Sequence, residues 1–126
     1  MREGKDITFV VWGPAVADAV KAADLLAAEG VSVEILDPRT LVPFDWETVF
    51  ASVRKTGRCV AISQCVDIGS YTGEIVSQVV AACFDDLDAP VLKVGAKNGI
   101  APQAFTLEQA FLPSPQDMVA AARQIL

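Results

Sequence analysis

Histidine is absent from the 126 residues of this chain. That absence excludes Ser-His-Asp and Cys-His nucleophile pairs, and it removes the side chain that most often binds transition metals. The first β-branched run is followed by Gly13-Pro14-Ala15 and not by a glycine-rich phosphate loop, so dinucleotide-binding and P-loop functions are excluded as well. We therefore expect no catalytic residues and no metal site within this chain.

Basic residues are scarce and scattered. Lys and Arg number 10 against 16 Asp and Glu, which gives a net charge of −6 and a pI near 4.4. Phosphate backbones are bound by clustered cations, and the densest group here, Arg54, Lys55 and Arg58, falls where a helix is expected to end. Cations at that position complement the helix dipole. We expect no nucleic-acid partner.

Long apolar runs and paired cysteines are also lacking. No segment reaches the length needed to cross a bilayer, and the charged N-terminus, residues 2–6, carries no apolar targeting stretch. Cys59, Cys65 and Cys83 form no CxxC pair and are odd in number. We expect a cytoplasmic protein without a membrane partner.

Strand-like and helix-like segments alternate along the whole chain. β-branched and aromatic runs predict strands, and apolar residues at helical spacing predict helices between them. The predicted strands cover residues 7–12, 31–36, 58–63 and 91–94; the predicted helices cover 15–29, 46–55, 74–87 and 115–125, with one helical turn at 107–111. Such alternation indicates an α/β fold with a largely parallel sheet between helix layers, and residues 1–126 are expected to form a single domain.

A proline-rich loop at 37–45 is the first candidate binding segment. Asp37, Arg39 and Asp45 gather there among prolines, with Leu41 and Pro43 between them. Two interpretations stay open: a self-contained loop closed by its own ion pairs, or a rigid edge against which a partner docks. Asp45 is also expected to cap the following helix.

The second candidate is the turn at 69–74, at the carboxyl end of the third predicted strand. Ligands of open α/β sheets bind at such ends, and backbone N–H groups entering a helix can hold an anion. The residues concerned are Gly69, Ser70, Tyr71, Thr72, Gly73 and Glu74. The alternative is that the two glycines only permit a tight turn and close helix packing.

The 37–45 loop and the stretch 52–58 resemble the C-terminal domain of the transketolase superfamily. The likeness is greatest to the beta subunit of the thiamine-diphosphate-dependent decarboxylating component of 2-oxo-acid dehydrogenase complexes. Further matching stretches lie at 2–8, 73–75, 84–91 and 112–114, so the resemblance spans the chain in order.

This resemblance implies a three-layer α/β/α fold with a five-stranded mixed, mostly parallel sheet. The additional strand is expected to be short and one strand antiparallel to the rest. The resemblance also implies a non-catalytic assembly and docking domain, with thiamine diphosphate and Mg bound elsewhere in the full enzyme. The implied partners are an alpha subunit and a second beta subunit in a heterotetramer, together with an acyltransferase core subunit.

Two departures from the family pattern leave the substrate open among pyruvate, branched-chain oxo acids and acetoin. Gln64-Cys65 stands where the family usually has a Glu or His pair, and residues 97–102 replace its usual Asp-x-Pro-x-Pro stretch. The resemblance also implies that the chain is a piece of a longer polypeptide. Two other readings remain: the C-terminal domain of a single-chain transketolase-like transferase, and a free-standing module that binds a small anion.

Overall fold

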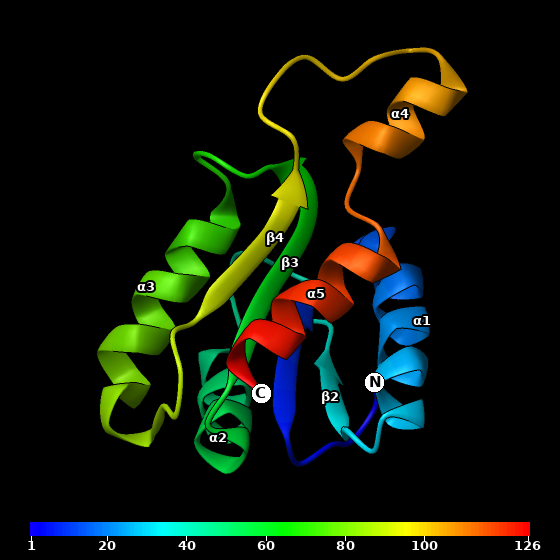
Figure 1. The fold of residues 1–126 in the computed structure, drawn as a ribbon. Coiled ribbons are helices and arrows are strands. Elements are labelled where there is room, and N and C mark those ends of the chain that lie inside the picture. Colours follow the sequence, from blue (N-terminus) through cyan, green and yellow to red (C-terminus); the bar gives the residue numbers. More distant parts are fainter.

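Four parallel strands form one sheet in the order β2-β1-β3-β4 in the computed structural model, which describes residues 1–126 (Figure 1). The strands are β1 (Ile7–Val11), β2 (Val33–Leu36), β3 (Cys59–Val66) and β4 (Leu92–Ala96). Phe9 of the central strand β1 pairs with Ile35 on one side and Val60 on the other. All four predicted strands are confirmed, with β3 extending three residues beyond its predicted end.

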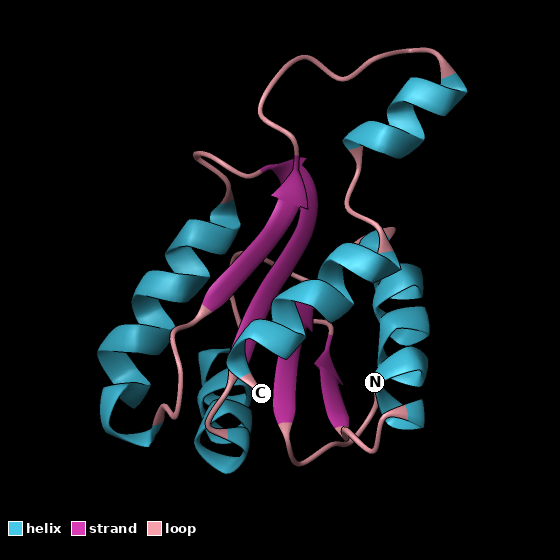
Figure 2. Ribbon diagram, viewed as in Figure 1, coloured by secondary structure: helices cyan, strands magenta, loops and turns pink.

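Helices cover both faces of the sheet, as Figure 2 shows. One face packs against α1 (Ala15–Ala28) and α5 (Pro115–Ile125), and the other against α2 (Trp46–Thr56) and α3 (Tyr71–Cys83). Successive side chains of a strand point to opposite faces, so Phe9 and Val11 join the first core while Val10 joins the second. The predicted three-layer α/β/α arrangement is confirmed.

The predicted five-stranded mixed sheet is wrong: four strands are present, all parallel. Antiparallel pairing is reduced to one isolated bridge between Arg2 and Ile35, outside the free edge of β2. The amides of Lys5 and Asp6 both donate to the carbonyl of Ser32, at 3.2 and 3.0 Å. These two hydrogen bonds direct the chain into β1, so the N-terminal residues form no second antiparallel bridge with β2.

The connection from β4 to α5 differs from the rest of the fold. It contains the seven-residue helix α4 (Phe105–Phe111), none of whose residues is buried, and it extends away from the sheet at the top of Figure 1. The short 3-10 helix η1 (Phe84–Asp86) follows α3 at the opposite end of the molecule. None of the helices combines the length and the apolar character needed to span a bilayer.

Candidate functional site

The carboxyl ends of β1, β2 and β3 meet at a group of aromatic side chains. Because neighbouring parallel strands end at the same edge of a sheet, the segments that follow them are brought together there. Phe44 lies 4.2 Å from Trp46 and 5.8 Å from Tyr71, measured between ring centroids. Trp12 meets Tyr71 edge-on at 6.3 Å, and Trp46 stacks on Phe50 at 5.7 Å. We call these five residues the aromatic cluster.

The aromatic cluster joins the two candidate segments predicted from the sequence. Tyr71, in the 69–74 segment, donates its hydroxyl hydrogen to the carbonyl of Leu41 in the 37–45 loop, at 3.2 Å. Within that loop, the Thr40 hydroxyl donates to the carbonyl of the exposed Pro43 at 2.7 Å. Leu41 is half-buried, whereas its neighbour Val42 is 88% exposed. The loop is thus held from both sides while it presents an apolar side chain outward.

The Asp37–Arg39 pair closes the start of the 37–45 loop. The Arg39 amide donates to Asp37 Oδ1 at 3.0 Å, and the Arg39 Nε lies 3.1 Å from Asp37 Oδ2. Arg39 has a φ of 62°, a conformation that non-glycine residues adopt at a cost, and these two bonds stabilise it. The Asp37 side chain is 13% exposed and that of Arg39 is 79% exposed. Both oxygens of the Asp37 carboxylate are therefore paired with Arg39, and the Arg39 guanidinium that they hold remains exposed to solvent.

Asp45 caps α2, as its sequence context predicted. Its carboxylate accepts from the Thr48 hydroxyl at 2.7 Å and from the Thr48 amide at 3.1 Å. These hydrogen bonds hold the pKa of Asp45 below its ordinary value. Asp45 is exposed, but its carboxylate is committed to fixing the end of the loop, whereas the Arg39 guanidinium is 79% exposed and projects into solvent.

The 69–74 segment enters α3 earlier than the sequence predicted. Gly69 has a φ of 77°, Ser70 is the N-cap residue, and Tyr71 already begins the helix. The Gly73 amide is occupied by the Ser70 carbonyl at 3.0 Å. The exposed Glu74 carboxylate lies in the first helical turn.

An open hollow of about 610 Å³ lies over this segment. The hydroxyls of Ser70 and Thr72 are hydrogen-bonded to each other, and Thr72 is fully buried. Glu74 places a negative charge where an anion would bind, and carboxylates already complement a helix N-terminus. The local chemistry therefore favours the turn-and-packing interpretation over an anion site.

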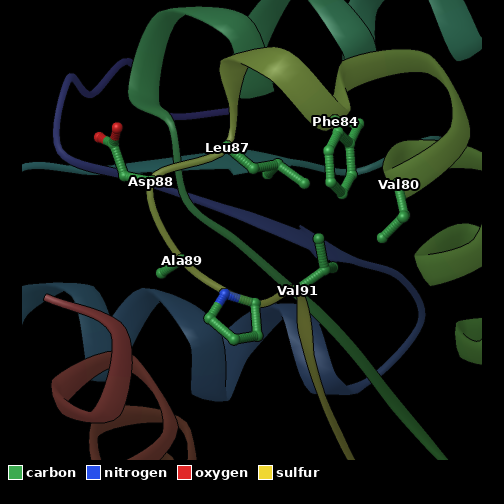
Figure 3. A pocket seen from close by; sticks show the side chains of 7 residues that line it. Val80, Phe84, Leu87, Asp88, Ala89 and Val91 are labelled. Atoms are coloured by element: carbon green, nitrogen blue, oxygen red, sulfur yellow. The ribbon is translucent and has the colours of Figure 1, made fainter.

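A second hollow lies at the opposite end of the sheet, between α3 and the start of β4 (Figure 3). It has a volume of about 570 Å³ and is lined mainly by apolar side chains: Val80, Phe84, Leu87, Asp88, Ala89, Pro90 and Val91. The one carboxylate, Asp88, points away from the apolar side chains and lies 3.4 Å from Arg58 Nη1. The hollow thus offers apolar surface but no reactive group.

No group of three His, Cys, Asp or Glu residues lies close enough to hold a metal ion. Burial raises the pKa of the Cys59 thiol to about 12 and also raises that of Cys83, while Cys65 is exposed. These residues do not fit the magnesium diphosphate of thiamine diphosphate, and we assign no step of thiamine chemistry to them.

Sequence reasoning missed the aromatic cluster and the hollow at Phe84. A signal for the cluster existed, because an aromatic residue follows each of three strands: Trp12 after β1, Phe44 after β2 and Tyr71 after β3. In a parallel sheet such residues share one edge. Phe84, which is 72% exposed, follows α3 directly and lines the hollow together with Leu87 and Val91.

Comparison with known proteins gives a consistent result. A family profile described as the transketolase C-terminal domain matches residues 1–118. The chain is 41% identical over 124 residues to the pyruvate dehydrogenase E1 component subunit beta of Rhizobium meliloti (strain 1021), covering 98% of this chain and 27% of that protein. It is 35% identical over 125 residues to the acetoin:2,6-dichlorophenolindophenol oxidoreductase subunit beta of Bacillus subtilis (strain 168), covering 99% and 36%. The chain spans about a third of the length of such curated relatives.

Solved structures match as well. A structure titled "Split gene transketolase, inactive beta4 tetramer" aligns with a TM-score of 0.80 and 31% identity, over 99% of this chain and 40% of that one. A 2-oxoglutarate:ferredoxin oxidoreductase from Magnetococcus marinus aligns with a TM-score of 0.61, over 97% of this chain and 18% of that one. At 17% identity the latter likeness concerns the fold alone.

Proposed function

Because this chain belongs to the transketolase C-terminal domain family, we propose that it is the non-catalytic assembly and docking domain of a thiamine-diphosphate-dependent 2-oxo-acid dehydrogenase beta subunit. The observation that carries the proposal is 41% identity, over 98% of the chain, to a pyruvate dehydrogenase E1 beta subunit. In this proposal residues 1–126 are one domain of a longer polypeptide. The complete enzyme decarboxylates a 2-oxo acid oxidatively.

The 37–45 loop is the docking edge in this proposal. Its shape is fixed by the Asp37–Arg39 pair, by the Asp45 cap and by the hydrogen bond from Tyr71, so little conformational entropy remains to be lost on binding. Arg39 and Val42 supply an exposed cation and an exposed apolar side chain. The proposed partners are an alpha subunit, a second beta subunit in a heterotetramer, and the acyltransferase core.

Thiamine diphosphate and Mg belong, in this proposal, to the complete assembly and not to this domain. The lack of a metal-ligating cluster among the residues of the chain supports that division. We also propose a cytoplasmic location, which the three free cysteines support.

The runner-up is the C-terminal domain of a transketolase-like transferase, which the TM-score of 0.80 and 31% identity to the split gene transketolase favour. A free-standing anion-binding module is the weakest candidate, because Glu74 places negative charge at the N-terminus of α3.

The test is an assay of the full-length polypeptide together with its alpha partner, thiamine diphosphate and Mg. Reduction of 2,6-dichlorophenolindophenol is measured with pyruvate, a branched-chain 2-oxo acid or acetoin as substrate. We expect one of them to drive dye reduction. Ketol transfer between sugar phosphates without dye reduction would establish the transferase instead. Isothermal calorimetry of the 126-residue chain with thiamine diphosphate and Mg should show no binding. A saturable binding signal would contradict the proposal that the cofactor is bound outside this domain.

A further inference from the structure

Asparagine occurs once in the chain, and a glycine follows it. Asn98 and Gly99 lie in the bend after β4, and both residues are exposed. Asparagine is thermolabile because the nitrogen of the next backbone amide can attack its side-chain carbonyl carbon. Glycine at that next position has no Cβ to obstruct the attack, and its backbone adopts many conformations. The dipeptide therefore has the composition that favours a reaction within the chain.

The hydrogen bonds around Asn98 leave the reacting groups free. The one bond of its side chain is made by the oxygen, since Oδ1 accepts from the Ile68 amide at 3.0 Å. The Asn98 amino group and the Gly99 amide donate no hydrogen bond. A Cβ built on Gly99 would meet a single heavy atom within 4 Å, Cε2 of Phe111 at 3.9 Å. The attacking nitrogen and the leaving amino group are thus both accessible.

The Ile68 amide lies where negative charge develops during such an attack. When the side-chain carbonyl carbon of Asn98 is attacked, the charge appears on Oδ1, and a backbone N–H already directed at that oxygen stabilises it. The loop that carries Ile68 is held in place by its neighbours. The Asp67 amide donates to the Ala96 carbonyl at 3.0 Å, and Lys93 Nζ donates to the Asp67 carbonyl at 2.7 Å. The fold therefore supplies a fixed donor at the reacting carbonyl.

We propose that Asn98-Gly99 is a site of deamidation within the chain, a modification that goes beyond the proposed assembly function. The Gly99 nitrogen forms a bond to Asn98 Cγ, the bond from Cγ to Nδ2 breaks, and Nδ2 leaves as ammonia with the proton that the Gly99 amide gives up. Water then opens the cyclic imide at either of its carbonyls, which yields aspartate or isoaspartate. One water is consumed for each ammonia released, so the reaction needs no oxidant or other co-reactant.

Either product alters the contact between the loops that follow β3 and β4. Aspartate brings a second carboxylate next to Asp67, whose Oδ1 is already buried without a hydrogen-bond partner, and the two negative charges repel each other. Isoaspartate moves one carbon from the side chain into the backbone, so the shortened side chain loses its reach to the Ile68 amide. Ile68 leads directly into the 69–74 segment. Deamidation should therefore loosen the entry to α3.

The test follows the peptide that contains residue 98 by chromatography and mass spectrometry while the full-length polypeptide is incubated at neutral and at mildly alkaline pH. We expect aspartate and isoaspartate to accumulate at residue 98, faster at the higher pH because the Gly99 nitrogen attacks after losing its proton. Gly99→Ala is the matched control. Its added methyl group has room beside Phe111, so the variant should keep the fold and slow the modification severalfold.

Hydrogen exchange of the Ile68 amide measures the consequence separately. Exchange should accelerate in the incubated wild type and in Asn98→Asp, and it should stay slow in incubated Gly99→Ala. A residue 98 that remains asparagine throughout the incubation, or a Gly99→Ala polypeptide modified as fast as the wild type, overturns the inference. Unchanged Ile68 exchange in Asn98→Asp overturns the proposed loosening of the entry to α3. None of these results affects the dye-reduction test of the proposed function.

Discussion

The 37–45 loop and the segment between β4 and α5, residues 97–112, which we call the arm, have equivalent places in the topology but are held in opposite ways. Each leads from the carboxyl end of a strand to a helix, and each exposes a large apolar side chain, Val42 at 88% and Ile100 at 96%. The loop is closed by its own ion pair, helix cap and aromatic packing. The arm is closed at its base by the hydrogen bond from the Lys97 amide to the Phe111 carbonyl, at 3.1 Å, and α4 beyond it buries nothing.

The difference shows that one domain can contain both a loop supported by its own contacts and a segment without such support. A preformed edge such as the loop binds with little ordering cost, so its contribution comes from side chains already in place. A segment such as the arm, whose helix buries no residue, receives little support from the core of its own domain. Changes in the aromatic packing of the loop should therefore alter the stability of the monomer, while changes in the exposed side chains of α4 should leave that stability nearly unaltered.

The largest expected effect comes from Phe44→Ala. Phe44 contacts Trp46 and Tyr71 at the centre of the aromatic cluster and is half-buried. Complete burial of a phenylalanine makes its truncation cost about 3–5 kcal/mol, so a loss of about 2–3 kcal/mol in the free energy of unfolding is expected here. Urea denaturation followed by circular dichroism measures it.

Phe105→Ala is the matched substitution in the arm. It should change the unfolding free energy of the monomer by less than about 0.5 kcal/mol, because the ring has no buried contact to lose. Equal losses for the two variants would remove the distinction between a preformed loop and an unsupported arm.

Glu34→Gln tests the contact between β2 and α2, the two elements that the 37–45 loop connects. Glu34, the second residue of β2, is 8% exposed; its carboxylate binds the Lys55 ammonium and accepts from the Gly4 amide at 3.2 Å. Burial alone would raise the Glu34 pKa, but hydrogen bonds from Lys55, Ser52 and Gly4 outweigh it and hold the pKa below its ordinary value of 4.5. The variant should lose about 1–2 kcal/mol at neutral pH.

The sign of the pH dependence follows from that lowered pKa. The ionised carboxylate stabilises the fold above the unfolded-state pKa, and this stabilisation is lost as the pH falls through the folded-state pKa. The difference between wild type and Glu34→Gln in urea denaturation should therefore shrink as the pH falls below 4.5. A difference that stays constant or grows toward acid pH contradicts this account of Glu34.

Tyr71→Phe isolates the hydrogen bond between the two candidate segments. The variant keeps the ring in the aromatic cluster and removes only the hydroxyl that donates to the Leu41 carbonyl at 3.2 Å. A loss of about 1 kcal/mol in the unfolding free energy is expected, together with faster hydrogen exchange in residues 40–44. Exchange that accelerates in α4 instead would mean that the Tyr71 hydroxyl supports the arm and not the loop.

Local sequence patterns predicted those parts of the fold that depend on neighbouring residues. β-branched and aromatic runs located the four strands, and the Asp45 cap and the start of the last helix at residue 115 are confirmed. The fifth strand came from the family resemblance and not from the residues, and only the Arg2 bridge remains of it. The chain turns at Lys5 and Asp6 through bonds to Ser32, a distant residue that no local pattern reveals.

The candidate site was predicted less completely, for a related reason. Loop composition alone identified Arg39 and its neighbours, but the link from Tyr71 to Leu41 requires knowing that β1 lies between β2 and β3. The arm was expected to be irregular, with a helical turn at 107–111, and periodicity cannot tell that its helix would bury nothing. Contacts between distant segments, and the absence of such contacts, emerge only from the three-dimensional arrangement.

Arg39→Ala should have a small effect on folding and the most informative effect on assembly. Its guanidinium is paired with Asp37 but is 79% exposed, and such surface pairs contribute less than about 1 kcal/mol to stability. Lys21→Ala is the matched control, since Lys21 is 67% exposed and paired with Asp18 at 2.8 Å. Both should leave urea denaturation nearly unchanged. In the full-length assembly, Arg39→Ala should lower the fraction of assembled enzyme at limiting concentration in analytical ultracentrifugation, while Lys21→Ala should not. Equal dissociation in the two variants would show that the 37–45 loop is a self-contained ion-paired turn, and the docking edge would have to be sought elsewhere on the domain.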